Sequence, residues 1–267
     1  MLLDADLYQR ICEHSIKKIN TASEALSPFP HIVIADVFPK DIYEQILGMI
    51  PSPAYFNKAN ARHVDEYGNS NRQRMRLCEA AFQALSDRER KFWTTIRAAI
   101  SSVPFRDAIF QKLSYGMQLR YGDKSRKAQV FPRGTLYSEQ EGYRIAPHPD
   151  TRDKVVTMQF AFPTDDRLAA MGTEFYSRSL NPLHLLREPR GFHLEKTMPF
   201  LPNHAYAFTV LNKIGLKSWH GRSTVRDAEG VRNSLLQIWY QTEDGTDREL
   251  KEYEAYLLAN CPQNIAA

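Results

Sequence analysis

The feature that most constrains the fold is a series of short strand patterns that begins near residue 111 and ends at residue 240. The clearest is residues 155–162, Val-Val-Thr-Met-Gln-Phe-Ala-Phe, a nearly continuous apolar run that Pro163 closes. Such a run, rich in β-branched and aromatic residues, is typical of a buried strand. About seven or eight short strands at this spacing favour a β-sandwich or jelly roll, which leaves few sheet edges exposed.

The other strand patterns alternate in polarity or are bounded by turn residues. They cover residues 113–121, 136–137, 143–145, 172–176, 204–211, 217–220 and 231–240. Residues 227–230, Asp-Ala-Glu-Gly, form a turn sequence, so we expect segments 217–220 and 231–240 to pair as an antiparallel hairpin. The 178–203 segment is predicted to be a loop that walls or covers a binding site.

The first 110 residues are predicted to be mostly helical, with one short strand near residues 31–35. Apolar residues recur at helical spacing over 3–19 and 41–50. Ser86 and Glu89 form a capping box at the start of a helix that Pro104 should end. A final helix is expected over residues 247–258.

We therefore expect a mainly β protein with flanking helices, of the α+β class. A mostly helical N-terminal region (1–110) would pack on a double-stranded β-helix, or jelly-roll, core (111–245), followed by a C-terminal helix (246–267). At 267 residues the three parts are expected to form one integrated domain.

The composition fits a cytoplasmic globular protein. Hydrophobic residues make up 43% of the chain and charged residues 25%, with a formal net charge of +4, and these values are ordinary for such proteins. No apolar run approaches the roughly 20 residues that a membrane span requires, and the N-terminus is acidic where a secretory signal would be basic. The three scattered cysteines, Cys12, Cys78 and Cys261, favour reduced thiols over a disulfide framework.

A candidate metal site begins at His148-Pro149-Asp150, directly before the 155–162 strand. In an extended strand, residues i and i+2 share a face about 6.5 Å apart, so His148 and Asp150 can bind one metal ion. The prolines around His148 remove backbone donors, which places the pair at a strand end or sheet edge. With His220 as the third ligand, two imidazoles and one carboxylate form the ligand set of a non-haem iron(II) site with open positions.

A second His-x-Asp pair, His63 and Asp65, serves as an internal comparison. It leads into residues 66–71, Glu-Tyr-Gly-Asn-Ser-Asn, which are polar and typical of a turn-rich loop. Because no buried strand follows this pair, we do not expect it to bind a metal.

Arg232 is the next residue of interest, because it is a charged residue in an otherwise apolar final strand pattern. Alternation places Arg232, Ser234, Leu236 and Ile238 on one face. If this is the inner face, a guanidinium and a hydroxyl lie beside the metal, where they can hold a carboxylate.

Together these motifs resemble those of iron(II)- and 2-oxoglutarate-dependent oxygenases, in the prolyl-hydroxylase-like branch. The similar stretch runs from Tyr137 to Tyr240, and Tyr137 matches a strand tyrosine that reaches the co-substrate in relatives. Its main motifs are Pro147–Asp150, Gly172–Phe175, Pro202–Phe208, Ser218–Gly221 and Arg232–Leu235. The segment 28–34, Pro-Phe-Pro-His-Ile-Val-Ile, is also similar to the start of such enzymes.

The resemblance implies that His148, Asp150 and His220 bind Fe(II), and that Arg232 holds the distal carboxylate of 2-oxoglutarate with help from Ser234. It also implies a dioxygenase that consumes O₂ and 2-oxoglutarate and releases succinate and CO₂. The primary reaction would be hydroxylation of an unactivated C–H bond in a small molecule or an amino-acid side chain, free or peptidyl.

Two other interpretations stay open. A cupin-like metalloenzyme would use the same ligands without a keto acid, and a non-catalytic binding jelly roll would keep the histidines for structure alone. Basic residues gather between Arg120 and Arg133, but such a segment is usually a solvated loop, so we expect neither a nucleic-acid nor a membrane partner.

Overall fold

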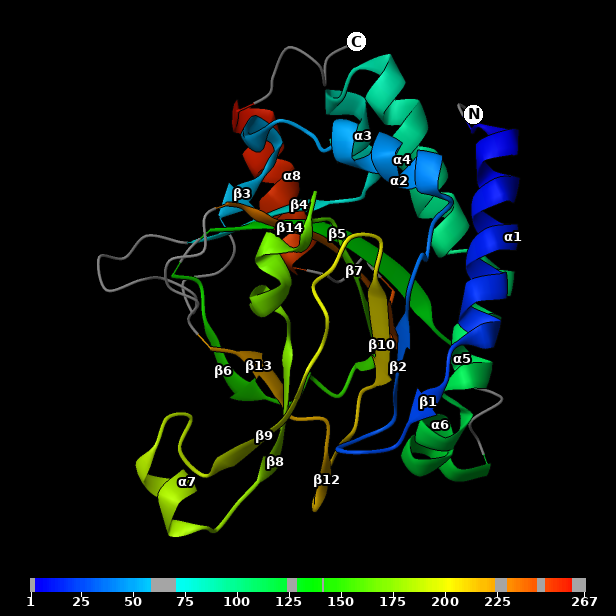
Figure 1. Ribbon diagram of the computed structural model, residues 1–267. Helices are drawn as coiled ribbons and strands as arrows, with labels where there is room; N and C mark the ends of the chain where they lie inside the picture. Colours follow the sequence, from blue (N-terminus) through cyan, green and yellow to red (C-terminus); the bar gives the residue numbers. More distant parts are fainter. Residues whose placement is uncertain are drawn as a thin grey trace.

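The computed structural model describes residues 3–58, 71–123, 129–140, 142–223, 230–243 and 248–260. Two facing antiparallel sheets form its centre, and helices cover the outer face of the larger sheet (Figure 1). In spatial order the larger sheet contains β1 (Glu24–Ala25), β2 (His31–Ile34), β10 (Ala205–Thr209), β7 (Lys154–Ala161), β14 (Arg232–Tyr240), β5 (Phe131–Glu139), β4 (Arg72–Arg76) and β3 (Asn57–Lys58). The smaller sheet contains β6 (Ile145–His148), β13 (His220–Arg222), β8 (Glu174–Arg178) and β9 (Phe192–Thr197).

The chain crosses repeatedly between these two sheets. Strands β5, β7, β10 and β14 lie in the larger sheet, whereas β6, β8, β9 and β13 lie in the smaller one. Every strand pair in them is antiparallel. This arrangement is the double-stranded β-helix. The predicted fold class, mainly β with flanking helices, is therefore confirmed.

The main core lies between the larger sheet and the helices. These helices are α1 (Ala5–Thr21), α2 (Lys40–Gly48), α3 (Glu79–Ala84), α4 (Asp87–Ile100), α5 (Val103–Lys112), α6 (Ser114–Tyr121) and α8 (Arg248–Asn260). A further short helix, α7 (Pro182–Leu186), lies between β8 and β9 of the smaller sheet and has no buried residue. Phe160 of β7 packs against Phe38 and Phe105, and Trp239 of β14 packs edge-on against Phe110 of α5. None of the helices in the described ranges is long and apolar enough to cross a membrane.

Alternation along β7 separates this core from the interior of the jelly roll. Met158 and Phe160 are fully buried on the helix side, whereas Thr157 and Gln159 line a cavity between the sheets. The strand predicted from the apolar run is therefore buried on both faces, but its inner face is polar. This polar face positions the candidate site.

Two expectations for the segment before β5 are wrong. Residues 113–121 were expected to form a strand but form α6, whose Met117 is buried one helical turn after Leu113. Pro104 does not end a helix: α4 ends at Ile100, and Pro104 lies in the first turn of α5, where a missing N–H breaks no helical hydrogen bond. The capping box of Ser86 and Glu89 is present as predicted.

Two further corrections concern the jelly roll. The expected hairpin between segments 217–220 and 231–240 does not form, because β13 pairs with β6 and β8 in the smaller sheet while β14 lies in the larger one. Most of its expected turn, residues 227–229, lies outside the described residues. The 178–203 segment is not a plain loop, since it contains α7 and the sheet strand β9.

Candidate metal centre

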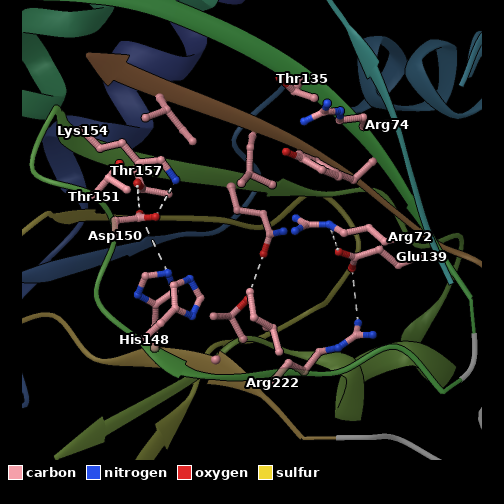
Figure 2. Close-up of a pocket in the computed structure, with 18 of the residues that line it drawn as sticks. Arg72, Arg74, Thr135, Glu139, His148, Asp150, Thr151, Lys154, Thr157 and Arg222 are labelled. Atoms are coloured by element: carbon pink, nitrogen blue, oxygen red, sulfur yellow. Dashed lines mark hydrogen bonds and ion pairs between the residues drawn. The ribbon is translucent and has the colours of Figure 1, made fainter. Parts of the chain in front are cut away.

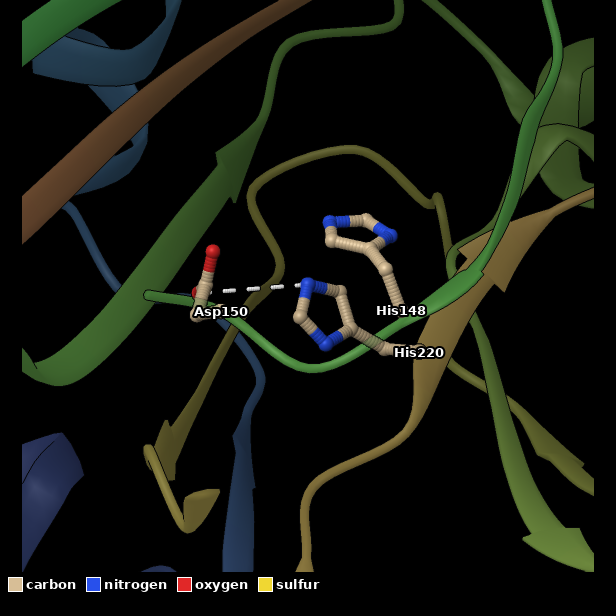
Figure 3. Close-up of side chains that lie close together, drawn as sticks. All are labelled: His148, Asp150 and His220. Carbon is tan, nitrogen blue, oxygen red and sulfur yellow. Dashed lines mark ion pairs between the residues drawn. The ribbon is translucent and has the colours of Figure 1, made fainter. Parts of the chain in front are cut away.

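Pairing between β6 and β13 brings the distant histidines together. His220, the first residue of β13, lies directly opposite His148, the last residue of β6, with ring centroids 4.5 Å apart. Asp150 follows in the connection to β7. One ligand atom from each of these three residues lies within 4.8 Å of the others (Figure 3). No other such group of histidine, cysteine or carboxylate side chains occurs in the described parts of the chain.

Backbone carbonyls fix the orientation of both imidazoles. Nδ1 of His148 lies 3.0 Å from the carbonyl oxygen of Ala146, and Nδ1 of His220 lies 3.0 Å from that of Ser218. A carbonyl oxygen only accepts hydrogen bonds, so each Nδ1 carries the proton and each Nε2 presents a lone pair. The Nε2 atom of His220 lies 3.9 Å from Oδ2 of Asp150, which is on the side where a metal would bind.

Asp150 is held by two donors from β7. The Lys154 ammonium lies 2.5 Å from its Oδ1 atom, and the Thr157 hydroxyl donates to Oδ2 at 2.7 Å (Figure 2). All three groups belong to one short stretch of chain, which turns the carboxylate toward the histidines. Partners of this kind restrict a metal ligand to one orientation.

The site favours the protonation states that bind metals. Burial opposes ionisation of Asp150, but the neighbouring Lys154 ammonium outweighs it and holds the pKa of the carboxyl well below its ordinary value. Burial, reinforced by His220, lowers the pKa of His148 to about 4, and burial also lowers the pKa of His220. At neutral pH both imidazoles are therefore neutral and the carboxylate is ionised, as metal coordination requires.

The three residues lie in the wall of a cavity of about 460 Å³ between the two sheets. This volume lies within the range of about 300–1,000 Å³ that is usual for small-molecule sites. Figure 2 shows Asp150, Lys154 and Thr157 on one side of the cavity and Arg72, Glu139 and Arg222 on the other.

Arg232 lies on the inner face of β14, an outcome that the alternation had left open, and is only 2% exposed. Its Nε donates to the Met171 carbonyl at 2.8 Å, one Nη forms an ion pair with Glu139, and the other donates to Oε1 of Gln159 at 2.9 Å. A guanidinium has five N–H donors, so these bonds use part of its capacity.

Glu139 forms ion pairs with three arginines at once, since Arg72 and Arg222 also place a nitrogen 2.9 and 3.4 Å from its carboxylate. Burial opposes ionisation of Glu139, but the three guanidiniums outweigh it and hold its pKa below the ordinary value. Burial lowers the pKa of Arg222 to about 10, which leaves it charged at neutral pH. Three cations surround one anion, so this end of the cavity retains an excess of positive charge.

Of the two other predicted co-substrate residues, Tyr137 lines the cavity, whereas Ser234 lies on β14 next to it outside the described lining. Ser234 is fully buried and its hydroxyl accepts from Nε2 of Gln159 at 3.1 Å. Tyr137 is half-buried beside it in the β5–β14 register, and the Arg72 guanidinium stacks on its ring at 3.8 Å. Gln159 thus lies between Arg232 and Ser234 and bonds to both.

Sequence reasoning missed several residues of this cavity. Arg133 was expected in a solvated basic loop, but it lies in β5, is 8% exposed and lines the cavity. Nothing in the sequence singled out Glu139 or Lys154. The arginines that contact Glu139 come from other strands, and the ion pair between Lys154 and Asp150 is evident only in the folded chain. His63 and Asp65 lie outside the described residues.

Apart from His148 and His220, none of the described histidines lines this cavity. His31 is fully buried and its Nδ1 contacts the Phe29 carbonyl, as expected for a packed residue. His184 of α7 and His193 of β9 stack on each other with ring centroids 4.8 Å apart, and Nδ1 of His204 contacts the Pro202 carbonyl.

No protein-family model matches the chain, and no curated protein matches it. Among solved structures, it is similar to a Pseudomonas putida prolyl-4-hydroxylase at 12% identity and a TM-score of 0.49, over 87% of this chain and 100% of that one. A 2OG-Fe(II) oxygenase family oxidoreductase from Burkholderia pseudomallei aligns at 11% identity and 0.48, over 87% and 92%. SnoK, a non-heme alpha ketoglutarate dependent carbocyclase from nogalamycin biosynthesis, aligns at 7% and 0.48, over 92% of each chain. At such low identities the chemistry of this chain rests on its own residues.

Proposed function

We propose that the protein is an Fe(II)- and 2-oxoglutarate-dependent dioxygenase that hydroxylates a C–H bond of a small molecule or an amino-acid side chain. The observation that carries this proposal is the convergence of His148, Asp150 and His220 in the wall of a cationic cavity between the two sheets. Such a cavity suits a metal ion, a dicarboxylate and a substrate together.

The donor set fits ferrous iron. His148, Asp150 and His220 would supply two imidazole nitrogens and one carboxylate, the ligand set of non-haem iron(II) sites that keep positions open for other ligands. When bound, iron would supply the activation of O₂ that couples decarboxylation of a 2-oxo acid to oxidation of a C–H bond, with one oxygen atom entering succinate and the other the substrate.

The protein's own part is binding, orientation and exclusion of water. The carbonyls of Ala146 and Ser218 keep Nε2 of each histidine available, and Lys154 and Thr157 orient the carboxylate of Asp150. Because the site lies between two sheets, it limits the access of bulk water to the reacting atoms.

Arg232 is proposed to hold the distal carboxylate of 2-oxoglutarate, with Ser234 and Tyr137 as neighbouring polar groups. The excess of guanidiniums over the single carboxylate of Glu139 supports this role, because a second carboxylate there would be stabilised by charge. Glu139 would share its arginines with the co-substrate.

The ion pair between Arg232 and Glu139 is also the observation that favours the second candidate, a metalloenzyme that uses no keto acid. In that case Glu139 already satisfies Arg232, and the arginine cluster is a structural network of the barrel. The two candidates differ in whether 2-oxoglutarate binds next to the metal.

The test is anaerobic reconstitution with Fe(II), followed by titration with 2-oxoglutarate. A visible charge-transfer absorption and substrate-stimulated succinate release are expected from the wild type. Asp150→Ala should lose both, because a buried ligand is removed, whereas Asp107→Asn, at an exposed helical site, should keep both.

Each outcome separates the candidates. Iron binding without any effect of 2-oxoglutarate would support the enzyme without a keto acid. Unchanged iron affinity in Asp150→Ala would contradict both metalloenzyme candidates and support a binding jelly roll.

A further inference from the structure

The inner face of β4 carries a row of arginines. Arg72, Arg74 and Arg76 alternate with Gln73 and Met75 and line the cavity, while Met75 is fully buried against the helices. In a strand whose outer face is part of the core, arginine at three successive inward positions cannot serve packing alone, because buried charge is costly without a polar or ionic environment.

Register places this row next to the jelly-roll wall. Arg74 lies opposite Tyr137 and Arg76 opposite Thr135 on β5, and both arginines are 5% exposed. Strand β4 follows β5 in the larger sheet but lies outside the eight strands of the double-stranded β-helix. The row therefore extends the cavity beyond the part that holds the candidate metal and Arg232.

Arg133 on β5 completes this end of the cavity. Its Nη2 donates to the carbonyls of Thr242 and Glu243 at 2.8 and 2.9 Å, and its guanidinium stacks on Tyr240 at 4.0 Å. The carbonyl dipoles and the aromatic face orient the guanidinium.

The distance from this end to the candidate metal suits a small molecule. Arg133 pairs with Ile238, and Ile238 pairs with Thr157, whose hydroxyl bonds to Asp150. Two strand spacings correspond to about 10 Å between the backbones of Arg133 and Thr157. A ligand anchored at the arginines can therefore present a carbon atom to the metal site.

The charge of the cavity points the same way. Among the described lining residues, cations outnumber carboxylates by seven to three. The cations are Arg72, Arg74, Arg76, Arg133, Lys154, Arg222 and Arg232, and the carboxylates are Glu139, Asp150 and Asp153. A divalent metal and a dianionic 2-oxo acid would cancel each other, so their binding would not change this balance among the described lining residues.

We propose that Arg74, Arg76 and Arg133 bind the acidic group of the primary substrate, which is a small molecule carrying a phosphate or a carboxylate. This inference rests on the proposed function, since it assigns the substrate of that site. The arginines are buried within the cavity, so the ligand is a small molecule and not a polymer such as nucleic acid.

The first experiment measures anion binding without turnover. Wild type is saturated with Mn(II) and 2-oxoglutarate under nitrogen and titrated with inorganic phosphate and, separately, with acetate, by calorimetry. The double variant Arg74→Gln/Arg76→Gln and the single variant Arg133→Gln are expected to weaken binding of the preferred anion at least tenfold.

Controls separate charge from folding. Arg74→Lys/Arg76→Lys should recover part of the affinity, and Arg187→Gln, at an exposed position, should leave it unchanged. Unaltered anion binding in the glutamine variants would overturn the proposal. So would a parallel loss of 2-oxoglutarate affinity, because the arginines would then serve the co-substrate.

The second experiment compares acidic compounds with their neutral analogues in succinate release. Phosphate esters against the parent alcohols, and carboxylates against their amides, identify which anion is used. Preference for the neutral member of each pair would overturn the inference while leaving the oxygenase intact. Absence of succinate release from every compound, with phosphate binding retained, would instead overturn the proposed function.

Discussion

Thr157 and Lys154 each donate a hydrogen bond to the carboxylate of Asp150. A substitution that removes only the hydroxyl of Thr157 tests its contribution separately from that of Lys154. Thr157→Val keeps the side-chain volume but removes the hydroxyl that donates to Oδ2. Removing such a supporting group typically lowers metal affinity about 10–100-fold, so we expect weaker binding of Mn(II) in an anaerobic titration. Thr135→Val, a matched change elsewhere in the same cavity, should leave the affinity unchanged. Equal affinities in both variants would show that Lys154 alone orients the carboxylate.

The histidines make the metal-free protein sensitive to acid. The folded-state pKa of His148 is about 4, below the ordinary value of 6.5, so the unfolded chain binds more protons between these pH values. Stability is therefore fully present above pH 6.5 and is lost as the pH falls toward 4. Urea unfolding at pH 7, 6 and 5 should show this loss, and His148→Asn should reduce its slope. The exposed His193→Asn serves as the control; an identical slope in both variants would contradict the prediction.

At the scale of single residues, the sequence predicted which side chains converge but not what surrounds them. The His-x-Asp spacing and the buried strand behind it pointed to His148 and Asp150, and the structure brings these two residues together with His220. Glu139 could not be found this way, because its three arginine partners come from β4, β13 and β14. Such contacts depend on register across strands.

Among the elements, β13 is the one whose position the metal site depends on most. Gly221 follows His220 where the register between β13 and β6 shifts, and a Cβ there would lie 2.6 Å from the Ile145 carbonyl oxygen. Gly221→Ala must push the two strands apart, which would cost about 1–3 kcal/mol and move His220 away from His148. Urea unfolding and Mn(II) titration should both show a loss. Gly48→Ala has no atom within 4 Å of the new Cβ and should bind Mn(II) normally; a normal metal affinity in Gly221→Ala would contradict the argument.

Elements were predicted well where apolar periodicity was strong and badly where polar groups face inward. Strand β4, Arg-Gln-Arg-Met-Arg, was not predicted because the side chains on its cavity face are charged. In most strands charged side chains lie on the solvent face. Helix α6 was mistaken for a strand because alternating residues in a short segment fit both periods. Its single buried turn from Leu113 to Met117 became evident only in the structure.

Over the whole molecule, the sequence indicated the jelly roll but not the sheet to which each strand belongs. Short strands in series are consistent with hairpins, and a hairpin was expected for β13 and β14. In the structure His220 of β13 pairs with His148 of β6, whereas apolar residues of β14, including Leu235 and Trp239, pack on the helices. Assigning strands to sheets required knowing both partners of each strand.

The expectation of one integrated domain can be tested with the tryptophans. Trp93 lies in α4 and Trp239 in β14, and both are fully buried in one core shared by the helices and the larger sheet. Trp219 lies just before β13. The variant Trp219→Phe/Trp239→Phe therefore reports on the helical layer alone, and Trp93→Phe reports on the jelly roll.

Because Phe105 and Phe110 of α5 contact Phe160 and Trp239 across the layers, neither layer can open without exposing the core of the other. In urea, the fluorescence midpoint of each variant should coincide with the midpoint from far-ultraviolet circular dichroism of the same variant. A fluorescence transition of the helical layer well before that of the jelly roll would mean that residues 1–110 unfold as a separate unit. The arginines of β4 would then belong to a unit that unfolds before the metal site. In that case, substrate binding would be lost at a lower urea concentration than metal binding.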